Sequence, residues 1–301
     1  MKVSVILVNY NGARYNGACI DSVLACKGEF ETEIYVVDNA STDESMNIIA
    51  EKYQGEETVK LEYLSQNYGF SYANNIGIKK AIEQKTDYVL LLNNDTEIQQ
   101  DMIEQLLHCA QRHKGCVIAP KIYYSDNREI IWSAGGEMSP VIRKAKHIGL
   151  NQKDCGQFGE EKYIDFATGC CLLIPVSIIE EVGFLDEQYF LYYEDTEYCF
   201  RLQTRGKKII FCPDAIVYHK VGASSKGKTS ALCAYYIARN WLYCNRQYLG
   251  KRYPVFLLYY AINRVVCCGL WALTGKEKLV RATWRGICDF TKNQMGKSKY
   301  Y

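Results

Sequence analysis

Residues 88–95 read YVLLLNND, an apolar run that stops abruptly at two amides and one carboxylate. A continuous apolar run of this length predicts a strand buried on both faces, as in a parallel sheet. Ligands of open α/β sheets bind beyond the carboxyl ends of the strands. A carboxylate flanked by amide oxygens also suits a hard cation such as Mg²⁺ or Mn²⁺. Because Asn and Asp also form ordinary turns, this stretch alone leaves a binding site and a turn equally open.

Apolar runs alternate with helical patterns through the first 120 residues. Strands are expected at 3–8, 34–37, 59–64, 88–92 and 116–119, and helices at 18–25, 42–52, 71–84 and 102–112. This alternation predicts βαβ units and an α/β fold with a mostly parallel central sheet flanked by helices. Neither a GxGxxG motif nor a P-loop follows the first strand, so glycine-rich backbone is not expected to cradle a phosphate. A metal ion is the alternative device for holding a diphosphate.

Other polar residues beside these elements are candidate nucleotide ligands. Asp38 ends the second strand, where a carboxylate can accept hydrogen bonds from a base or from ribose hydroxyls. It can instead stabilise the following helix by its charge, but we favour binding. Ser41 and Glu44 form a capping-box pattern at the start of that helix. Asn75 lies early in the next helix, where an amide is a poor helix former, so it either faces a ligand or is merely tolerated.

Beyond residue 121 the alternation of strands and helices weakens. Residues 121–165 are expected to be irregular, as in long functional loops. Glu194 and Asp195 then follow an aromatic run and precede a helix predicted for 196–205. Carboxylates are stabilised at the amino end of a helix, but a carboxylate in a partly apolar site can also act as a general base. His219 closes a later apolar strand, as Asp95 closes the fourth, and we expect it to be a metal ligand.

The net charge of +2 is unevenly distributed along the chain. Residues 220–301 hold 15 Lys and Arg against two acids, a net +13, whereas residues 1–219 carry −11. A basic end on an acidic body suggests an anionic membrane face, and no nucleic acid is expected because no recognition motif accompanies the charge. The 14 Cys show no CxxC spacing and no signal-peptide pattern precedes the first strand. This favours reduced thiols in a cytosolic protein and argues against a zinc site.

The last 80 residues predict a helical, basic appendage. Helices are expected at 231–249 and at 255–273, the second nearly all apolar but interrupted by Asn263 and Arg264. A spanning helix needs about 20 apolar residues, and a central Arg opposes spanning. We therefore expect residues 255–273 to lie in the membrane interface; packing on the protein or on a second subunit is the alternative. Residues 222–229, small and basic, are a candidate lid over a donor substrate.

Eight short segments stand in a definite order along the chain. They are Val8-Asn9-Tyr10-Asn11, Val37-Asp38-Asn39-Ala40-Ser41, residues 67–77, Asn93-Asn94-Asp95, Ser133-Ala134-Gly135-Gly136, Thr168-Gly169-Cys170, Tyr193-Glu194-Asp195 and Tyr218-His219. With these segments the chain, from residue 3 to about residue 246, resembles the inverting glycosyltransferases of family 2, which have the GT-A fold. The likeness is greatest to rhamnosyltransferase-like bacterial members. Each segment alone is weakly specific, whereas eight in order are strongly so.

The resemblance implies a role for each candidate residue. Asp195 would be the catalytic base with Glu194 beside it, and Asp95 and His219 would hold Mn²⁺ or Mg²⁺. Asn93 stands where the family's DxD motif has its first Asp, and an amide there can bind ribose or support the metal through water. The nucleotide would contact Val8, Tyr10, Asp38, Asn67, Asn75, Asn93 and Asn94. The donor or acceptor would contact Gly135, Gly136, Thr168, Gly169 and Arg239.

The implied reaction moves a sugar, rhamnose as the first guess, from a dTDP or UDP donor to a lipid-linked saccharide in cell-surface polysaccharide synthesis. Residues 1–220 would form the catalytic domain, with a nucleotide-sugar half (1–121) and an acceptor half (122–220). Residues 221–301 would attach the protein peripherally to the inner face of the cell membrane, and a homodimer is open. Two alternatives remain. One is a nucleotidyltransferase, although its glycine-rich first loop is missing, and the other is a non-catalytic sugar-nucleotide or lipid-binding module, suggested by Asn93.

Overall fold

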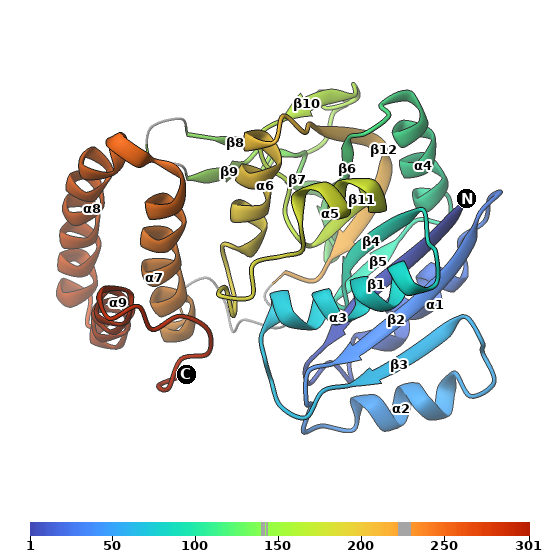
Figure 1. Cartoon of the computed structure of the whole chain (residues 1–301), viewed down its shortest axis with the longest axis horizontal. Helices are drawn as coiled ribbons and strands as arrows, with labels where there is room; N and C mark the ends of the chain where they lie inside the picture. The colour runs from blue at the N-terminus through green and yellow to red at the C-terminus, as the bar shows by residue number, and fades with distance from the viewer. Residues whose placement is uncertain (140–141, 143, 222–229) are drawn as a thin grey trace.

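One ten-stranded sheet forms the centre of the protein, in the order β10-β12-β6-β11-β4-β1-β2-β3, with β5 beside β12 and β7 beside β6 (Figure 1). The computed structural model describes residues 1–139, 142, 144–221 and 230–301. The strands of this sheet are β1 (Lys2–Asn9), β2 (Glu31–Asp38), β3 (Val59–Tyr63), β4 (Tyr88–Asn93), β5 (Thr96–Ile98), β6 (Val117–Tyr124), β7 (Asn127–Ser133), β10 (Lys162–Ile164), β11 (Cys171–Pro175) and β12 (Ile209–His219). Strands β1 to β4 run parallel, and β11 lies antiparallel between β4 and β6. The predicted α/β fold with a mostly parallel sheet is confirmed.

Helices cover both faces of the sheet. On one face lie α1 (Asn16–Leu24), α2 (Ser45–Lys52) and α4 (Met102–Arg112), and on the other α3 (Phe70–Glu83), α5 (Val176–Val182) and α6 (Glu194–Thr204). Successive residues of β4 point into the two clusters, Leu90 into the first and Leu91 into the second. A strand covered on both faces must be apolar on both, which explains the unbroken run at 88–92.

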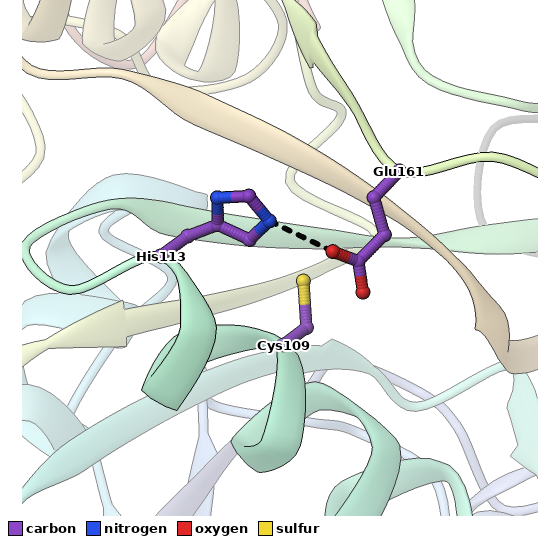
Figure 2. A group of neighbouring side chains, drawn as sticks. All are labelled: Cys109, His113 and Glu161. Carbon is purple, nitrogen blue, oxygen red and sulfur yellow. Dashed lines mark hydrogen bonds and ion pairs between the residues drawn. The ribbon is translucent and has the colours of Figure 1, made fainter.

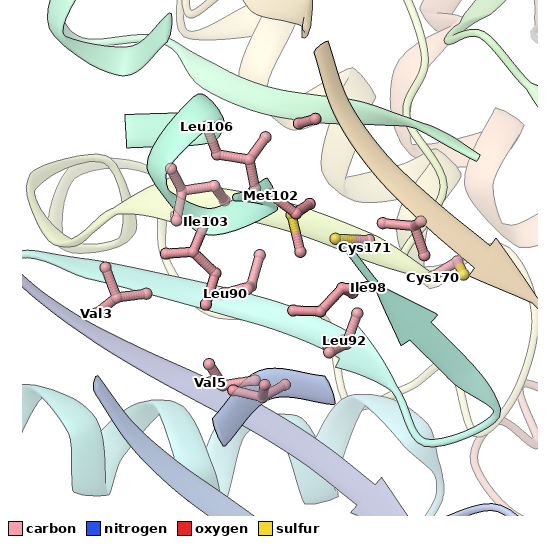
Figure 3. Close-up of a cluster of buried hydrophobic side chains, with 14 of the residues drawn as sticks. Val3, Val5, Leu90, Leu92, Ile98, Met102, Ile103, Leu106, Cys170 and Cys171 are labelled. Atoms are coloured by element: carbon pink, nitrogen blue, oxygen red, sulfur yellow. The ribbon is translucent and has the colours of Figure 1, made fainter. Parts of the chain in front are cut away.

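The contact between α4 and β4 is typical of this core. Figure 3 shows Met102, Ile103 and Leu106 of α4 lying over Leu90 and Leu92 of β4. The three α4 side chains are fully buried, and burial of such a side chain contributes about 1.5–3 kcal/mol. Helix α4 has the bounds predicted for it from the spacing of its apolar residues.

Residues 121–165 are more regular than the sequence predicts. They contain β7 and β10 of the main sheet and a separate antiparallel pair, β8 (Gly136–Met138) with β9 (Ala145–His147). Three of these strands are only three residues long, which is too short for an alternating pattern to show. Their partners are set by tertiary structure, since β10 pairs with β12.

Three helices form the end of the chain: α7 (Ala231–Tyr248), α8 (Tyr253–Leu273) and α9 (Glu277–Thr291), with the 3₁₀ turn η1 (Gly250–Arg252) before α8. They stand side by side at one end of the molecule, beyond α6 (Figure 1). Phe190, which precedes α6, packs in one cluster with Tyr235 and Tyr236 of α7 and Leu279 of α9. The helices are therefore joined to the sheet domain through α7. Residues 222–229, the predicted lid, lie outside the described residues.

Helix α8 presents an apolar face that the rest of the chain does not cover. Residues 250–273 are long and apolar enough to cross a membrane by length and composition, and only 11% of the apolar stretch is buried. The large side chains that are more than half exposed are Val255, Leu258, Ile262, Val265, Val266, Leu270 and Leu273. Arg264 turns the other way, with its guanidinium 5.6 Å from the Trp241 ring of α7. The exposed face is therefore not interrupted by this charge.

Two glycines make a matched test of how the end of the chain is packed. A Cβ on Gly286 of α9 would lie 2.4 Å from the Tyr235 carbonyl oxygen of α7, whereas a Cβ on Gly269 of α8 meets nothing within 4 Å. We expect Gly286→Ala to lower the free energy of unfolding by about 1–3 kcal/mol, because backbone must move. Gly269→Ala should raise it slightly, by up to about 1 kcal/mol, through helix propensity. Denaturant unfolding of both variants checks this, and equal effects would contradict the packing described.

Candidate active site

Four strand ends meet at one edge of the sheet. Asn9 ends β1, Asp38 ends β2 and Asn93 ends β4, and these strands are parallel neighbours. His219 ends β12, which is parallel to β6; because β6 and β4 both run antiparallel to β11, His219 lies at the same edge. We call this edge the rim, and the polar residues that follow the strands are gathered there.

Asn9 makes the most hydrogen bonds among the rim residues at the ends of β1 and β2. It is fully buried, and its Nδ2 donates to Asp38 Oδ1 at 2.9 Å. Its Oδ1 accepts from Asn16 Nδ2 at 2.7 Å and from Asn94 Nδ2 at 3.4 Å. One amide thus links the ends of β1 and β2 to α1 and to the turn after β4. Asn94 is committed to this network, because it also donates to Asn16 Oδ1 at 2.8 Å.

The capping box predicted for Ser41 and Glu44 is wrong. Helix α2 begins at Ser45 without a side-chain cap. The Ser41 hydroxyl instead donates to Asp38 Oδ1 at 2.5 Å, and the Ser41 N–H donates to Asp38 Oδ2 at 3.1 Å. The carboxylate competes successfully for the serine, because a charged acceptor forms a stronger hydrogen bond than a neutral group. Asp38 is consequently held in one orientation, 5% exposed at the rim.

Asp95 and His219 form a close pair. The Asp95 Oδ1 and His219 Nε2 atoms are 3.2 Å apart, and both side chains are more than nine-tenths buried. Strand β5, which starts just after Asp95, pairs with the end of β12, so Thr96 lies opposite His219. The backbone carbonyl of Asp95 also accepts from the Lys220 N–H at 2.9 Å. The predicted meeting of these two residues, 124 positions apart, is therefore present in the structure.

This pair fits a divalent cation such as Mn²⁺ or Mg²⁺. Adjacent ligands of an octahedral ion at about 2.1 Å lie about 3 Å apart, close to the separation of the two atoms. Within the part of the chain that the structure describes, His219 Nδ1 is buried without a hydrogen-bond partner. The Trp132 ring packs edge-on against the imidazole at 4.6 Å and limits its rotation. Carboxylate oxygen and imidazole nitrogen are suitable donors for these ions.

Asp195 lies at the same rim, held by the loop before β11. Its Oδ2 accepts from the Gly169 N–H at 3.2 Å, and its Oδ1 accepts from the Thr196 N–H at 2.6 Å. The next residue, Cys170, accepts through its carbonyl from the Asn93 N–H at 2.8 Å. The segment 169–170 therefore touches Asp195 through the Gly169 N–H and the end of β4 through the Cys170 carbonyl, which places Asp195 next to the strand end that precedes Asp95.

The environment of Asp195 makes its carboxyl a better proton acceptor. Burial raises the pKa of Asp195 above the ordinary aspartate value, although the hydrogen bonds from Gly169 and Thr196 act in the opposite direction. Burial, and then the neighbouring charge of Asp195, raise the pKa of Glu194. The Glu194 Oε2 atom is buried without a hydrogen-bond partner among the described residues. A carboxylate with a raised pKa binds a proton more strongly at neutral pH.

The backbone just before these acids is strained and clamped from α7. Tyr192 and Tyr193 have φ values of 64° and 75°, in the left-handed region that bulky residues rarely adopt. Asn240 of α7 donates through Nδ2 to the Leu191 carbonyl at 3.0 Å and to the Tyr192 carbonyl at 2.8 Å. The strain persists because surrounding structure fixes it, as at many functional sites. Asn240 thus fixes the backbone that leads into Glu194 and Asp195.

Two predicted contacts are corrected by the structure. Arg239 is fully buried, and its guanidinium donates to the Gln294 carbonyl at 3.3 Å and the Gly296 carbonyl at 2.8 Å. It fastens the C-terminal segment to α7 and is not available to a donor sugar. Asn75 is likewise buried, and its Nδ2 donates to the Leu185 carbonyl while its Oδ1 accepts from the Leu185 N–H. Its amide joins α3 to the segment before α6 and is not presented to a nucleotide.

The other predicted contacts lie at or near the rim in varied settings. Tyr10 is 49% exposed just after β1, with Val8 inside that strand. Asn67 accepts from the Gly69 N–H at 3.0 Å and shapes the turn before α3. Gly135, with φ of 82°, and Gly136 lie where a Cβ would meet Ile164 or Phe166, so packing already explains these glycines. Thr168 and Gly169 are adjacent to Asp195.

The predictions from sequence missed three rim residues. Asn9 ends an apolar strand as Asp38 does, so the pattern of a polar residue at a strand end, which indicated Asp38, also indicates Asn9. Ser41 was assigned to helix capping, although its hydroxyl orients Asp38. Trp132 packs between His219 and His147, with ring distances of 4.6 and 4.7 Å, and no sequence pattern indicates this stack.

The rim of this mostly parallel sheet therefore carries a carboxylate–imidazole pair, a second buried carboxylate and the hydrogen-bonded Asp38, a set that can hold a metal ion and a general base at one edge. The description Glycosyl transferase family 2 matches residues 4–183, and the chain belongs to that family.

Relatives of known or assigned activity agree with this family. The chain is 27% identical to the low-salt glycan biosynthesis hexosyltransferase Agl10 of Haloferax volcanii, over 83% of this chain and 77% of that protein. It is 23% identical to the dTDP-rhamnosyl transferase RfbF of Shigella flexneri, over 74% of this chain and 70% of the relative. It is 26% identical to the N-acetylglucosaminyl-diphospho-decaprenol L-rhamnosyltransferase of Mycobacterium tuberculosis, over 71% and 75%. A rhamnosyltransferase-like member of family 2 is therefore supported.

Solved structures confirm the fold, which is GT-A. GalNAc-T7 with UDP, GalNAc and Mn²⁺ superposes with a TM-score of 0.62 at 19% identity, over 73% of this chain and 44% of that chain. Staphylococcus aureus TarS 1-349 in complex with UDP superposes with a TM-score of 0.56 at 20% identity, over 81% and 65%. The chain thus spans less than two thirds of either protein, and the likeness concerns the fold alone.

The raised pKa of Glu194 makes stability depend on pH. Because its folded-state pKa lies above the unfolded value, the native state binds the proton more strongly, and stability is lost as pH rises through the folded-state pKa. Glu194→Gln removes this dependence, so the variant should gain stability relative to the wild type toward alkaline pH. Urea unfolding from acid to alkaline pH measures this, with the exposed Glu180→Gln as control. Parallel pH profiles for wild type and Glu194→Gln would contradict it.

Proposed function

We propose that the protein moves a hexose, rhamnose first among the candidates, from a nucleoside-diphosphate donor to a lipid-linked saccharide with inversion at the anomeric carbon. The placing of the Asp95–His219 pair and Asp195 at one rim carries this proposal, since the adjacent residues Gly169 and Cys170 contact Asp195 and the end of β4. The printed activities of two relatives, a dTDP-rhamnosyl transferase and a decaprenol-linked rhamnosyltransferase, favour the donor and the acceptor named here.

On the nucleotide side, Asp38 is the proposed partner of the base. It is fixed by Asn9 and Ser41, so its orientation is set before a ligand arrives. Binding to a preorganised group costs less ordering entropy than binding to a free side chain. The exposed Tyr10 and half-buried Asn93 flank this position, from the ends of β1 and β4.

Asp95 and His219 are the proposed ligands of Mn²⁺ or Mg²⁺. Such an ion, when bound, neutralises charge on the leaving diphosphate as a Lewis acid. The chain's own contribution is to hold the carboxylate and the imidazole at a fixed separation through the β5–β12 pairing. Trp132 keeps the imidazole ring in place.

Asp195 is the proposed general base. The acceptor hydroxyl gives its proton to the Asp195 carboxylate while the hydroxyl oxygen attacks the anomeric carbon. The bond from that carbon to the diphosphate oxygen breaks, and the nucleoside diphosphate leaves. A single displacement inverts the stereochemistry, and no covalent sugar–enzyme intermediate is required. The raised pKa of Asp195 favours this proton transfer.

The decisive variant is Asp195→Asn. Loss of a general base is expected to lower turnover by about 10²–10⁴-fold, because the amide cannot accept the proton. Binding of dTDP or UDP, measured by calorimetry with Mn²⁺, should stay within about threefold of the wild type, since Asp195 is not placed on the nucleotide side. Transfer is followed as acceptor-dependent release of nucleoside diphosphate from a panel of nucleotide sugars.

The exposed Asp214→Asn of β12 is the matched control and should retain full activity. Chelation of divalent cations should stop turnover of the wild type, and added Mn²⁺ should restore it. Full activity of Asp195→Asn would remove this residue from the role of base. Release of pyrophosphate would identify a nucleotidyltransferase instead, and metal-independent binding with no turnover would favour a non-catalytic module.

We further propose that the exposed face of α8 rests in an anionic membrane surface, where the lipid-linked acceptor is found. The face is apolar along its length, and basic residues follow it at Lys276, Lys278, Arg281 and Arg285. An interfacial helix binds through its buried apolar area and through attraction between basic residues and anionic lipids. A peripheral position on the cytoplasmic side follows from this proposal, and a second protein copy on the same face is the competing occupant.

Val265→Glu tests the membrane contact. Val265 is 72% exposed, so the variant should fold, but a charge on the buried side of an interfacial helix opposes binding. Co-sedimentation with vesicles containing anionic lipid should weaken about tenfold or more, because burial of one Val side chain alone contributes about 1.5 kcal/mol. Ile48→Glu, at 45% exposure on α2, is the control and should leave binding unchanged. Unchanged binding by Val265→Glu, or conversion of a wild-type dimer to a monomer, would overturn the proposal.

A further inference from the structure

A second group of metal-ligating side chains lies away from the rim. Cys109 and His113 come from the end of α4 and Glu161 from the loop before β10, and their ligand atoms all lie within 4.8 Å of one another (Figure 2). The His113 Nε2 and Glu161 Oε2 atoms are 2.7 Å apart. Helix α4 ends shortly before β6 begins, so this group lies toward the edge of the sheet opposite to the rim.

The local structure explains why these three side chains converge. Cys109 and His113 are four residues apart, so they project from the same side of the last helical turn. The helical path continues to His113, whose N–H donates to the Cys109 carbonyl at 2.9 Å. Cys109 is fully buried, while the side chains of His113 and Glu161 are 28% and 22% exposed. The group is therefore half enclosed, with one side open to solvent.

Cys212 of β12 stands beside this group. Its Sγ atom donates to the Gln105 carbonyl of α4 at 3.7 Å, one helical turn before Cys109. Cys212 is itself buried. The four side chains come from α4, the loop before β10 and β12, which are distant in sequence.

We propose that Cys109, His113, Glu161 and Cys212 bind one Zn²⁺ ion that fastens the loop before β10 to α4 and β12. Thiolate sulfur, imidazole nitrogen and carboxylate oxygen are all ligands of Zn²⁺, which is usually four-coordinate. Binding releases one proton from each thiol, and the resulting site carries a net charge of −1. Arg112, paired with the other Glu161 oxygen, offsets that charge. Tetrahedral Zn–S and Zn–N distances of about 2.3 and 2.1 Å place neighbouring ligand atoms about 3.4–3.8 Å apart, so the His113–Glu161 separation of 2.7 Å widens and the longer separations close on binding.

The simpler explanation for part of the group is an ion-pair cluster. Glu161 contacts both Arg112 and His113, which by itself joins the loop to the helix. That explanation does not account for the buried Cys109 thiol, whose Sγ atom lies within 4.8 Å of the ligand atoms of both His113 and Glu161. The two explanations differ in one measurable property, which is affinity for a thiophilic cation.

Titration with Co²⁺ tests the proposal directly on the full-length protein. Co²⁺ in a tetrahedral site with thiolate ligands gives intense visible bands and a sulfur-to-metal charge-transfer band. We expect one equivalent of Co²⁺ to produce both, and Zn²⁺ to bleach them. His113→Gln should weaken Zn²⁺ binding on the order of 100-fold or more in competition with a chromogenic chelator, since even outer-shell changes cost about 10- to 100-fold.

His108→Gln is the matched control, because His108 lies on the same helix but is exposed. It should leave the cobalt spectrum and the affinity for Zn²⁺ unchanged. Zn²⁺ should also raise the midpoint of thermal unfolding of the wild type, and raise it less for His113→Gln and for Glu161→Gln. Absence of a thiolate–cobalt band, or equal Zn²⁺ affinities for wild type and His113→Gln, would overturn the zinc site. A disulfide bond between Cys109 and Cys212 in the purified protein would also overturn the proposal.

Discussion

The hydrogen bonds of one buried amide, Asn9, hold the active rim together. Four strands end at this rim, and each end leaves polar groups that must be satisfied once they are buried. Asn9 uses its donor on Asp38 and its acceptor on Asn16 and Asn94, so that three segments are fixed by one side chain. An aspartate at this position would place a second negative charge against Asp38, and a leucine would leave several buried polar atoms without partners, each costing about 1–3 kcal/mol. The order of the rim therefore depends on the amide itself.

The sequence predicted the sheet and the part of the site that strand ends determine. Asp38, Asp95 and His219 each follow an apolar strand, and parallel strands bring such residues to a common edge whatever their separation along the chain. Where the outcome depended on a choice between partners, local patterns failed. Ser41 matches a capping box, but a nearby carboxylate takes its hydroxyl. Asn75 and Arg239 are polar residues of the kind that contact ligands. In the structure both donate instead to backbone carbonyls of segments distant in sequence.

Metal-ligand spacing shows the same limit of sequence reasoning. The missing CxxC pattern argued against zinc, because such motifs bring ligands together within a single turn. Cys109 and His113 satisfy a different local rule, the spacing of one helical turn, which is common in proteins that bind no metal. Glu161 and Cys212 approach them only through the packing of α4 against β12 and the path of the loop before β10. That packing is a tertiary property, and no window of sequence contains it.

The hydrogen bond from Asn240 to the Tyr192 carbonyl means that the terminal helices and the sheet domain are not structurally independent. A chain of contacts runs from α8 to the rim. Helix α8, with its uncovered apolar face, packs on α7 through Phe256, Tyr260 and Trp241. Helix α7 in turn grips the strained backbone from which Asp195 projects. The terminal helices for this reason support the backbone beside the rim. A chain trimmed at the end of the sheet would keep the Asn9 network and lose the two hydrogen bonds that fix the backbone before Glu194 and Asp195.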